Sequence, residues 1–184
     1  MKSISRNLVL IAGFFFIFQS SVGASELIYS TPGFTLIRGT TIGVAPLQNL
    51  TQSGSAGDRV SSLIANIFAE SRMFRVYGED VFKTRMQYNG LNPSLPVDRS
   101  ISVKIGQQTG MNYVIFGSVI EYGYQLTPQG TRTLPIAGID IRIVDVSSGK
   151  IIFAGSFTKE GTPGTTVDHV AMDAVKAFYE KVMR

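Results

Sequence analysis

Residues 139–155 read IDIRIVDVSSGKIIFAG, and this stretch decides the fold. Ile139, Ile141 and Ile143 alternate with Asp140 and Arg142, which is the two-residue period of a strand with one buried face. A small polar segment at residues 147–150 follows, and a second apolar run begins at once. So short a turn leaves no room for a crossover, so the two strands are predicted to be antiparallel neighbours.

The residues before this hairpin predict a third strand of the same sheet. Residues 111–122 read MNYVIFGSVIEY, a β-branched and aromatic run typical of a mostly buried strand. Gly110 precedes it and is expected to stop a helix in the left-handed conformation. Tyr124 to Pro135 then reads as a polar connection that contains two prolines and a glycine.

The remaining elements follow from periodicity and capping. A strand is expected over 41–47, a helix from about Ser55 with one apolar stripe, a strand at 75–77, and helices over 79–88, 98–109 and 166–182. The order β-α-β-α-α-β-β-β-α predicts a single compact α/β domain over residues 40–184, a mixed sheet with helices packed on it.

The first 24 residues are expected to be a signal peptide. Lys2 and Arg6 precede a short apolar run, and Val22-Gly23-Ala24 offers the small residues of a cleavage site, so export to the periplasm is predicted. Losing this segment lowers the net charge from +4 to +2, which gives no reason to expect a nucleic-acid partner. The later chain holds no stretch that would cross a membrane as a helix.

Residues 25–39 are expected to form an N-terminal arm that packs on the domain or on a neighbouring subunit. The chain has no cysteine, so disulfides cannot stabilise it, and burying an arm on another subunit is one way to gain stability. Phe34, Leu36 and Ile37 are the residues predicted to make that subunit contact.

The side-chain inventory does not predict an enzyme, a cofactor or a metal. His169, the one histidine, is expected on the solvent side of the last helix, and without cysteine neither a Cys–His pair nor the usual zinc site can be built. Glu79 and Asp80 look like charges at a helix N-terminus and not a general acid–base pair. Five tyrosines could form a carbohydrate-stacking surface, although residues of this kind are usually part of amphipathic elements; they are Tyr88, Tyr113, Tyr122, Tyr124 and Tyr179.

Four segments resemble the CsgG-like family of secretion-channel proteins and its PelC-like members that lack transmembrane hairpins. They are residues 42–50 (IGVAPLQNL), 69–76 (AESRMFRV), 106–119 (GQQTGMNYVIFGSV) and 141–151 (IRIVDVSSGKI), and they occur in the family's order. The resemblance implies the family's α/β fold. The family's two membrane hairpins would fall at 124–135 and 159–166, where this chain has only short connections, and the lipidation cysteine of many relatives is missing.

The resemblance therefore implies a non-enzymatic periplasmic structural subunit. Such a subunit would form a homo-oligomeric ring at the outer membrane, held there by other outer-membrane or periplasmic proteins of a secretion, polysaccharide-export or flagellar/motility apparatus. Two alternatives stay open: a regulatory binding module resembling the outer-membrane activators of cell-wall synthases, and a monomeric carbohydrate-binding protein, which rests on the tyrosines alone.

Overall fold

The structure, a computed structural model, describes residues 27–32, 34–127, 130 and 132–184. The predicted signal peptide over residues 1–24 lies outside the described residues, as do Ser25, Glu26 and Gly33 of the arm.

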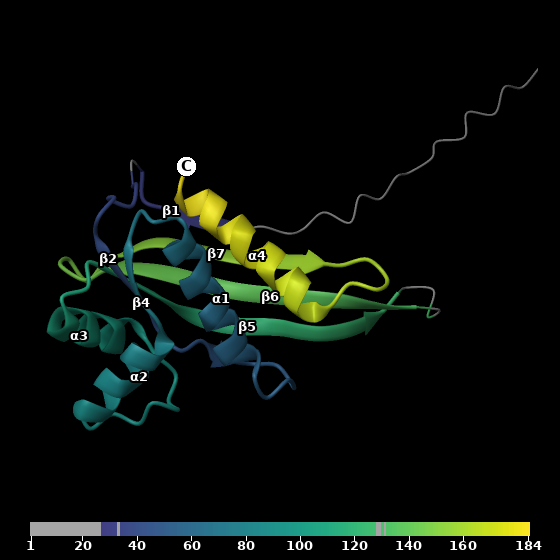
Figure 1. The fold of residues 1–184 in the computed structure, drawn as a ribbon, viewed down its shortest axis with the longest axis horizontal. Helices are drawn as coiled ribbons and strands as arrows, with labels where there is room; N and C mark the ends of the chain where they lie inside the picture. Colours follow the sequence, from purple (N-terminus) through teal and green to yellow (C-terminus); the bar gives the residue numbers. More distant parts are fainter. Residues whose placement is uncertain (1–26, 33, 128–129, 131) are drawn as a thin grey trace, which may run out of the picture.

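Within the described residues, seven strands form one mixed sheet (Figure 1). Its order is β1-β7-β6-β5-β2-β4, and the short β3 pairs with β5 beyond the end of β2. Strands β5, β6, β7 and β1 are antiparallel neighbours, whereas β2 runs parallel to both β4 and β5. The strands are β1 (Leu27–Ser30), β2 (Thr41–Val44), β3 (Gln48–Asn49), β4 (Arg75–Tyr77), β5 (Tyr113–Leu126), β6 (Thr133–Asp145) and β7 (Ile151–Glu160).

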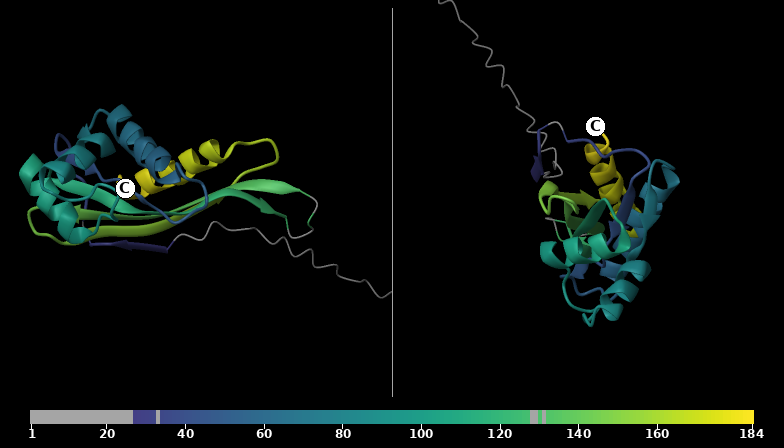
Figure 2. Two further views of the ribbon diagram at one scale, coloured as in Figure 1. Left: turned by 90° about the horizontal axis from the view of Figure 1, so that it is seen from below. Right: turned by 90° about the vertical axis from the view of Figure 1, so that its left-hand side faces the viewer.

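Two pairs of helices cover the two faces of this sheet (Figures 1 and 2). Tyr113 and Ile115 of β5 point into the core beneath α1 and α4, whereas Val114 and Phe116, the alternate residues, point into the core beneath α2 and α3. The mixed sheet between helices confirms the predicted fold class. The helices are α1 (Ala56–Glu70), α2 (Glu79–Tyr88), α3 (Arg99–Thr109) and α4 (Val167–Val182).

The larger core lies between the sheet and the helices α1 and α4. The predicted stripe of α1 is buried at Val60, Ile64 and Phe68 but only partly buried at Leu63 and Ile67. The whole predicted apolar face of α4 is buried, and its Phe178 ring contacts those of Phe68, Phe153 and Phe157. Phenylalanine rings thus join both helices to β7.

All nine predicted elements are present, and two short strands were not expected. β3 lies between the predicted strand over 41–47 and the predicted helix from about Ser55, and β1 lies in the predicted arm, where it pairs with β7 as the edge strand. β1 has only four residues, which is too few for a clear period-two pattern.

The prediction of a polar connection from Tyr124 to Pro135 was wrong. β5 continues to Leu126 and β6 begins at Thr133, so the two strands pair over most of that segment. Pro135 is tolerated because a proline lacks only the amide donor, and its carbonyl oxygen accepts from the Gly161 amide at 2.8 Å.

The β5–β6 hairpin therefore extends past its neighbours. The last residue of β6 with a partner in β7 is Ile136, and β3 leaves β5 at Val119. Beyond Ile136 and its β5 partner Gly123, only two strands remain paired, and this ribbon projects beyond the helices (Figure 2).

Candidate interaction site

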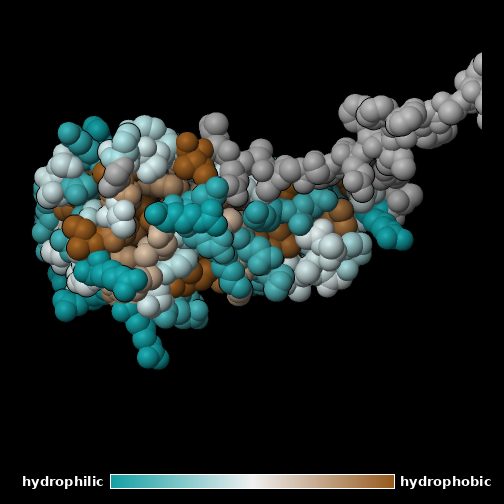
Figure 3. All heavy atoms as spheres, turned by 90° about the horizontal axis from the view of Figure 1, so that it is seen from above, coloured by the Kyte–Doolittle hydropathy of each residue, from teal (hydrophilic) through white to brown (hydrophobic). Residues whose placement is uncertain are grey.

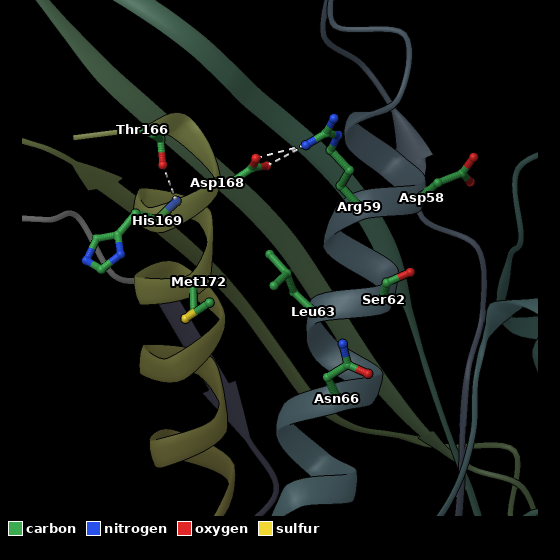
Figure 4. Close-up of a pocket in the computed structure, with 9 residues that line it drawn as sticks. All are labelled: Asp58, Arg59, Ser62, Leu63, Asn66, Thr166, Asp168, His169 and Met172. Carbon is green, nitrogen blue, oxygen red and sulfur yellow. Dashed lines mark hydrogen bonds and ion pairs between the residues drawn. The ribbon is translucent and has the colours of Figure 1, made fainter. Parts of the chain in front are cut away.

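A groove of about 550 Å³ runs between the N-terminal halves of α1 and α4 (Figure 4). Leu63 of α1 and Met172 of α4 point toward one another across it and form its apolar floor. The polar lining residues lie around that floor, and they are Asp58, Arg59, Ser62, Asn66, Thr166, Asp168 and His169.

One end of the groove is closed by an ion pair between the two helices. The Nη1 atom of Arg59 donates to both carboxylate oxygens of Asp168, at 3.1 and 2.8 Å (Figure 4). The Tyr122 hydroxyl of β5 donates to the same carboxylate. Three elements, α1, α4 and β5, therefore meet at Asp168.

The electrostatics of this cluster follow from those contacts. Burial, followed by the hydrogen bond to Asp168, raises the pKa of Tyr122 to about 12. The hydrogen bond from Tyr122 and the ion pair with Arg59 hold the pKa of Asp168 below its usual value, and Asp168 raises the pKa of Arg59 in turn. At neutral pH the hydroxyl is therefore protonated, the carboxylate is ionised, and each is occupied by a partner within the chain. Such a cluster fastens the helices together and offers no free base or nucleophile.

His169 lies where the sequence predicted, on the solvent side of α4. Its imidazole points away from the groove floor (Figure 4), and Nε2 lies 3.9 Å from Asp173. Its backbone amide is capped by the Thr166 hydroxyl at 3.3 Å. The Thr166 hydroxyl is thus engaged as the cap of α4, and the sequence contains no second histidine.

Glu79 and Asp80 occupy the first two positions of α2, as predicted. Glu79 is mostly buried, and burial raises its pKa; Oε2 lies 3.9 Å from the Nζ atom of Lys83. Lys83 makes its closer contact, 2.8 Å, with Asp58 of α1. These charges join α1 to α2.

The tyrosines do not form one surface. Tyr113 is buried, with its ring edge-on to Phe34 at a centroid distance of 6.1 Å. Tyr179 packs edge-on against Phe68 at 5.0 Å, and Tyr88 stands alone at the end of α2. Only Tyr122 and Tyr124 are neighbours: they lie two residues apart on β5, on the face where the Tyr122 hydroxyl reaches α4.

The three predicted contact residues of the arm have different environments. Leu36 is buried in the core of its own chain, 2% exposed, and Phe34 packs against the same core. Ile37 is 63% exposed. The arm is tied down by the Gly39 amide, which donates to the Met73 carbonyl at 2.7 Å. Ile37 is thus the residue of the three that faces outward, and the subunit contact stays a prediction.

Besides Ile37 of the arm, the projecting hairpin also has exposed apolar side chains. Tyr124 and Leu126 are 63% and 67% exposed, and they lie two residues apart on the same side of β5. Elsewhere, on the side drawn in Figure 3, apolar side chains form small patches separated by polar ones.

The sequence reasoning missed both the Arg59–Asp168–Tyr122 cluster and the hairpin surface. Arg59 and Asp168 are 109 residues apart and belong to no motif, so the sequence offers no signal for their pairing. The alternation of Tyr122, Tyr124 and Leu126 was the available signal for the hairpin surface.

The described part of the chain contains no group of three or more histidine, aspartate or glutamate side chains placed to hold a metal. In the same residues, no helix combines the length and the apolar character needed to cross a membrane.

Comparison with known proteins gives structural matches only. No protein-family model and no curated protein sequence matches the chain. The PelC dodecamer from Paraburkholderia phytofirmans is similar in structure, with a TM-score of 0.64 and 18% identity over 88% of this chain and 98% of that one. The lipoprotein GNA1162 from Neisseria meningitidis has a TM-score of 0.56 at 19% identity, covering 78% of this chain and 97% of the other.

The C-terminal domain of LpoB from Salmonella enterica is also similar, with a TM-score of 0.51 and 20% identity over 69% of this chain and 85% of that domain. Together these matches show that the chain has the fold shared by PelC, GNA1162 and the LpoB C-terminal domain, which confirms the predicted structural resemblance.

Proposed function

We propose that this protein is a non-enzymatic structural subunit that assembles into a ring at the periplasmic side of the outer membrane. The ring would be part of a secretion, polysaccharide-export or flagellar/motility apparatus. The shared fold with PelC, whose solved structure is a dodecamer, supports this proposal.

One structural observation carries it: exposed apolar side chains lie at opposite ends of β5. Ile37 stands just before β2, whose Ile42 pairs with Tyr113 at the start of β5. Leu126 stands at the far end of the same strand (Figure 1). A closed ring needs a head-to-tail contact between two different surfaces of each subunit. The hairpin of one copy against the arm of the next provides such a pair.

Native mass spectrometry of protein extracted from the envelope tests this contact. The variants Ile37→Asp and Leu126→Asp should each lose the ring, because each places a charge in an apolar contact. Leu95→Asp, a change at a leucine that is also more than half exposed, on the loop before α3, serves as the control and should keep the ring. A stable monomer as the native species refutes the ring.

A mixing experiment tests the head-to-tail geometry. Each single variant keeps one intact contact surface, so mixing Ile37→Asp with Leu126→Asp protein should give heterodimers joined by one contact and no closed ring. If the mixture restores complete rings, the two residues do not belong to one contact.

The predicted export has its own test. We expect cleavage after Ala24, and N-terminal sequencing of the envelope protein should read Ser-Glu-Leu. An intact Met1 start in a membrane fraction contradicts that part of the proposal.

The second candidate function is a regulatory binding module, and the similarity to the LpoB C-terminal domain favours it. A module of this kind would bind its partner as a single copy. Co-purification from the native envelope separates the two, because a ring subunit is recovered with many copies of itself and a regulatory module with a partner enzyme.

A further inference from the structure

Three cationic side chains line a hollow of about 560 Å³ between α3 and the turn that joins β6 to β7. These two segments lie at the end of the molecule opposite the projecting hairpin (Figure 1). Arg99 and Lys104 come from α3, and Lys150 comes from the turn between β6 and β7. Ser100, Gln107 and Ser148 add hydroxyl and amide groups to the same lining. The hollow thus offers several hydrogen-bond donors together with three positive charges.

The turn that carries Lys150 is fixed in shape. The Asp145 carboxylate accepts from the Ser147 hydroxyl and from the amide of Ser148, at 2.6 and 2.7 Å. Gly149 has a φ of 67°, and its amide donates to the Asp145 carbonyl at 2.8 Å. These contacts hold Lys150 at a set position beside α3.

The turn and α3 are also packed on one another. A Cβ atom on Gly106 of α3 would lie 2.6 Å from Cγ2 of Val146, so glycine at this position lets the Val146 side chain pack directly against the α3 backbone. Val103 belongs to the lining and is half-buried. The hollow is therefore a feature of the packed fold.

The positive charges of this hollow are not neutralised within the described residues. Arg99, Lys104 and Lys150 are all exposed, and none belongs to an ion pair of the described chain. The two nearby carboxylates have other roles: Asp98 accepts from the Ile101 amide at 2.8 Å as the cap of α3, and Asp145 holds the turn. The charge of the hollow therefore faces an incoming ligand.

We propose that this hollow binds a phosphate-type oxyanion, either free or displayed as the headgroup of an anionic lipid. Arginine and lysine are the usual phosphate partners, because charge-assisted hydrogen bonds to phosphate oxygens are stronger than neutral ones. A phosphate also carries enough charge to meet several cations at once, and hydroxyl and amide donors can bind its remaining oxygens. The residues that line the hollow do not include Ile37 or Leu126, the residues proposed for the subunit contact.

Isothermal titration of the protein with inorganic phosphate, and flotation with vesicles of phosphatidylglycerol or of phosphatidylcholine, test the proposal. Lys104→Gln and Lys150→Gln should each weaken binding about tenfold, the usual effect of losing a hydrogen bond to a charged group. Lys176→Gln, at an exposed lysine on α4, is the matched control and should bind as the wild type does. Lys104→Arg keeps the positive charge and should bind about as tightly as the wild type, in contrast to Lys104→Gln.

The outcomes distinguish a free phosphate from a lipid headgroup, and they also show whether the site exists. Binding to free phosphate supports a soluble ligand, and binding only to phosphatidylglycerol vesicles supports a headgroup on a membrane surface. If neither probe binds, or if Lys176→Gln weakens binding as much as Lys104→Gln does, the site is overturned. A monomer that binds phosphate would refute the ring alone, and a ring without phosphate binding would refute this site alone.

Discussion

The Tyr122 hydroxyl donates a hydrogen bond to the Asp168 carboxylate and so joins the middle of β5 to the first turn of α4. Asp168 also receives Arg59 from α1, which makes it the meeting point of a strand and two helices. Since the three residues are far apart in the sequence, this cluster forms only when the whole domain has folded.

Replacing Tyr122 should change the alkaline stability of the protein. Its folded-state pKa of about 12 is raised above the usual tyrosine value of about 10, so its contribution to stability is complete below the unfolded value and is lost as pH rises through the folded one. In Tyr122→Phe this loss between about pH 10 and 12 should disappear. Urea unfolding across that range measures it, with Tyr124→Phe on the exposed hairpin as the control. A stability gap between wild type and Tyr122→Phe that stays constant over the range would contradict the assignment.

Replacing Asp168 should change how the stability of the protein depends on pH in the acid range. Its folded-state pKa is lowered, so its contribution is present above the unfolded carboxylate value of about 4 and is lost as pH falls through the folded value. Asp168→Asn should be less stable than the wild type at neutral pH, and the two should converge in acid. Thermal melting at a series of pH values reports this. Asp173→Asn is the control at an exposed carboxylate of the same helix, whose partner, the His169 imidazole, is 3.9 Å away; it should destabilise the protein much less.

Ile64→Ala should lower the free energy of unfolding by about 2–5 kcal/mol, because Ile64 is fully buried between α1 and the sheet. Ile67 is on the same helix but only partly buried, so Ile67→Ala is the internal comparison and should cost clearly less. Chemical denaturation of both variants decides the matter; equal losses would mean that the buried face of α1 is centred elsewhere.

Gly117→Ala should prevent stable folding. Gly117 has a φ of 156°, and an added Cβ would stand 1.9 Å from the Asp140 carbonyl oxygen of β6. Backbone strain and the clash together should cost at least about 3 kcal/mol. Gly123→Ala is the matched control, because it lies in the same strand with nothing within 4 Å of an added Cβ. Circular dichroism and melting temperature compare them, and a Gly117→Ala protein as stable as Gly123→Ala would show that the strands separate easily here.

The sequence predicted the central elements because each carries a strong local pattern. The alternation at Ile139, Ile141 and Ile143 specified a strand with one buried face, and all three side chains are buried. The stripe of α4 from Val167 to Val182 likewise matches its buried face. Such patterns report which face of an element is covered, and they need no knowledge of its partner.

The contacts between elements could not be predicted in this way. Nothing in the local sequence of Leu36 distinguishes a residue that packs on its own chain from one that packs on a neighbour, and the structure places it in its own core. The extension of the hairpin was missed because Pro135 reads as a breaker, although only the proline nitrogen is unable to pair. The hollow beside α3 depends on a turn and a helix that are separate in the sequence, so its three cations have no shared motif.

The two-stranded end of the β5–β6 hairpin has a consequence for how the amides of this chain exchange with solvent. A ribbon of two strands is marginally stable in water by itself, and beyond Ile136 neither β7 nor β3 pairs with it. Near this point two single hydrogen bonds connect it to the end of β7, from the Gly161 amide to the Pro135 carbonyl and from the Gln125 side chain to Glu160. Amide hydrogens near Leu126 should therefore exchange fastest within the hairpin, while those near Ile141, in the middle of the sheet, exchange only when the domain unfolds. A partner that covers the ribbon end would hold these strands together, so slowed exchange at Leu126 would record occupancy of that surface directly.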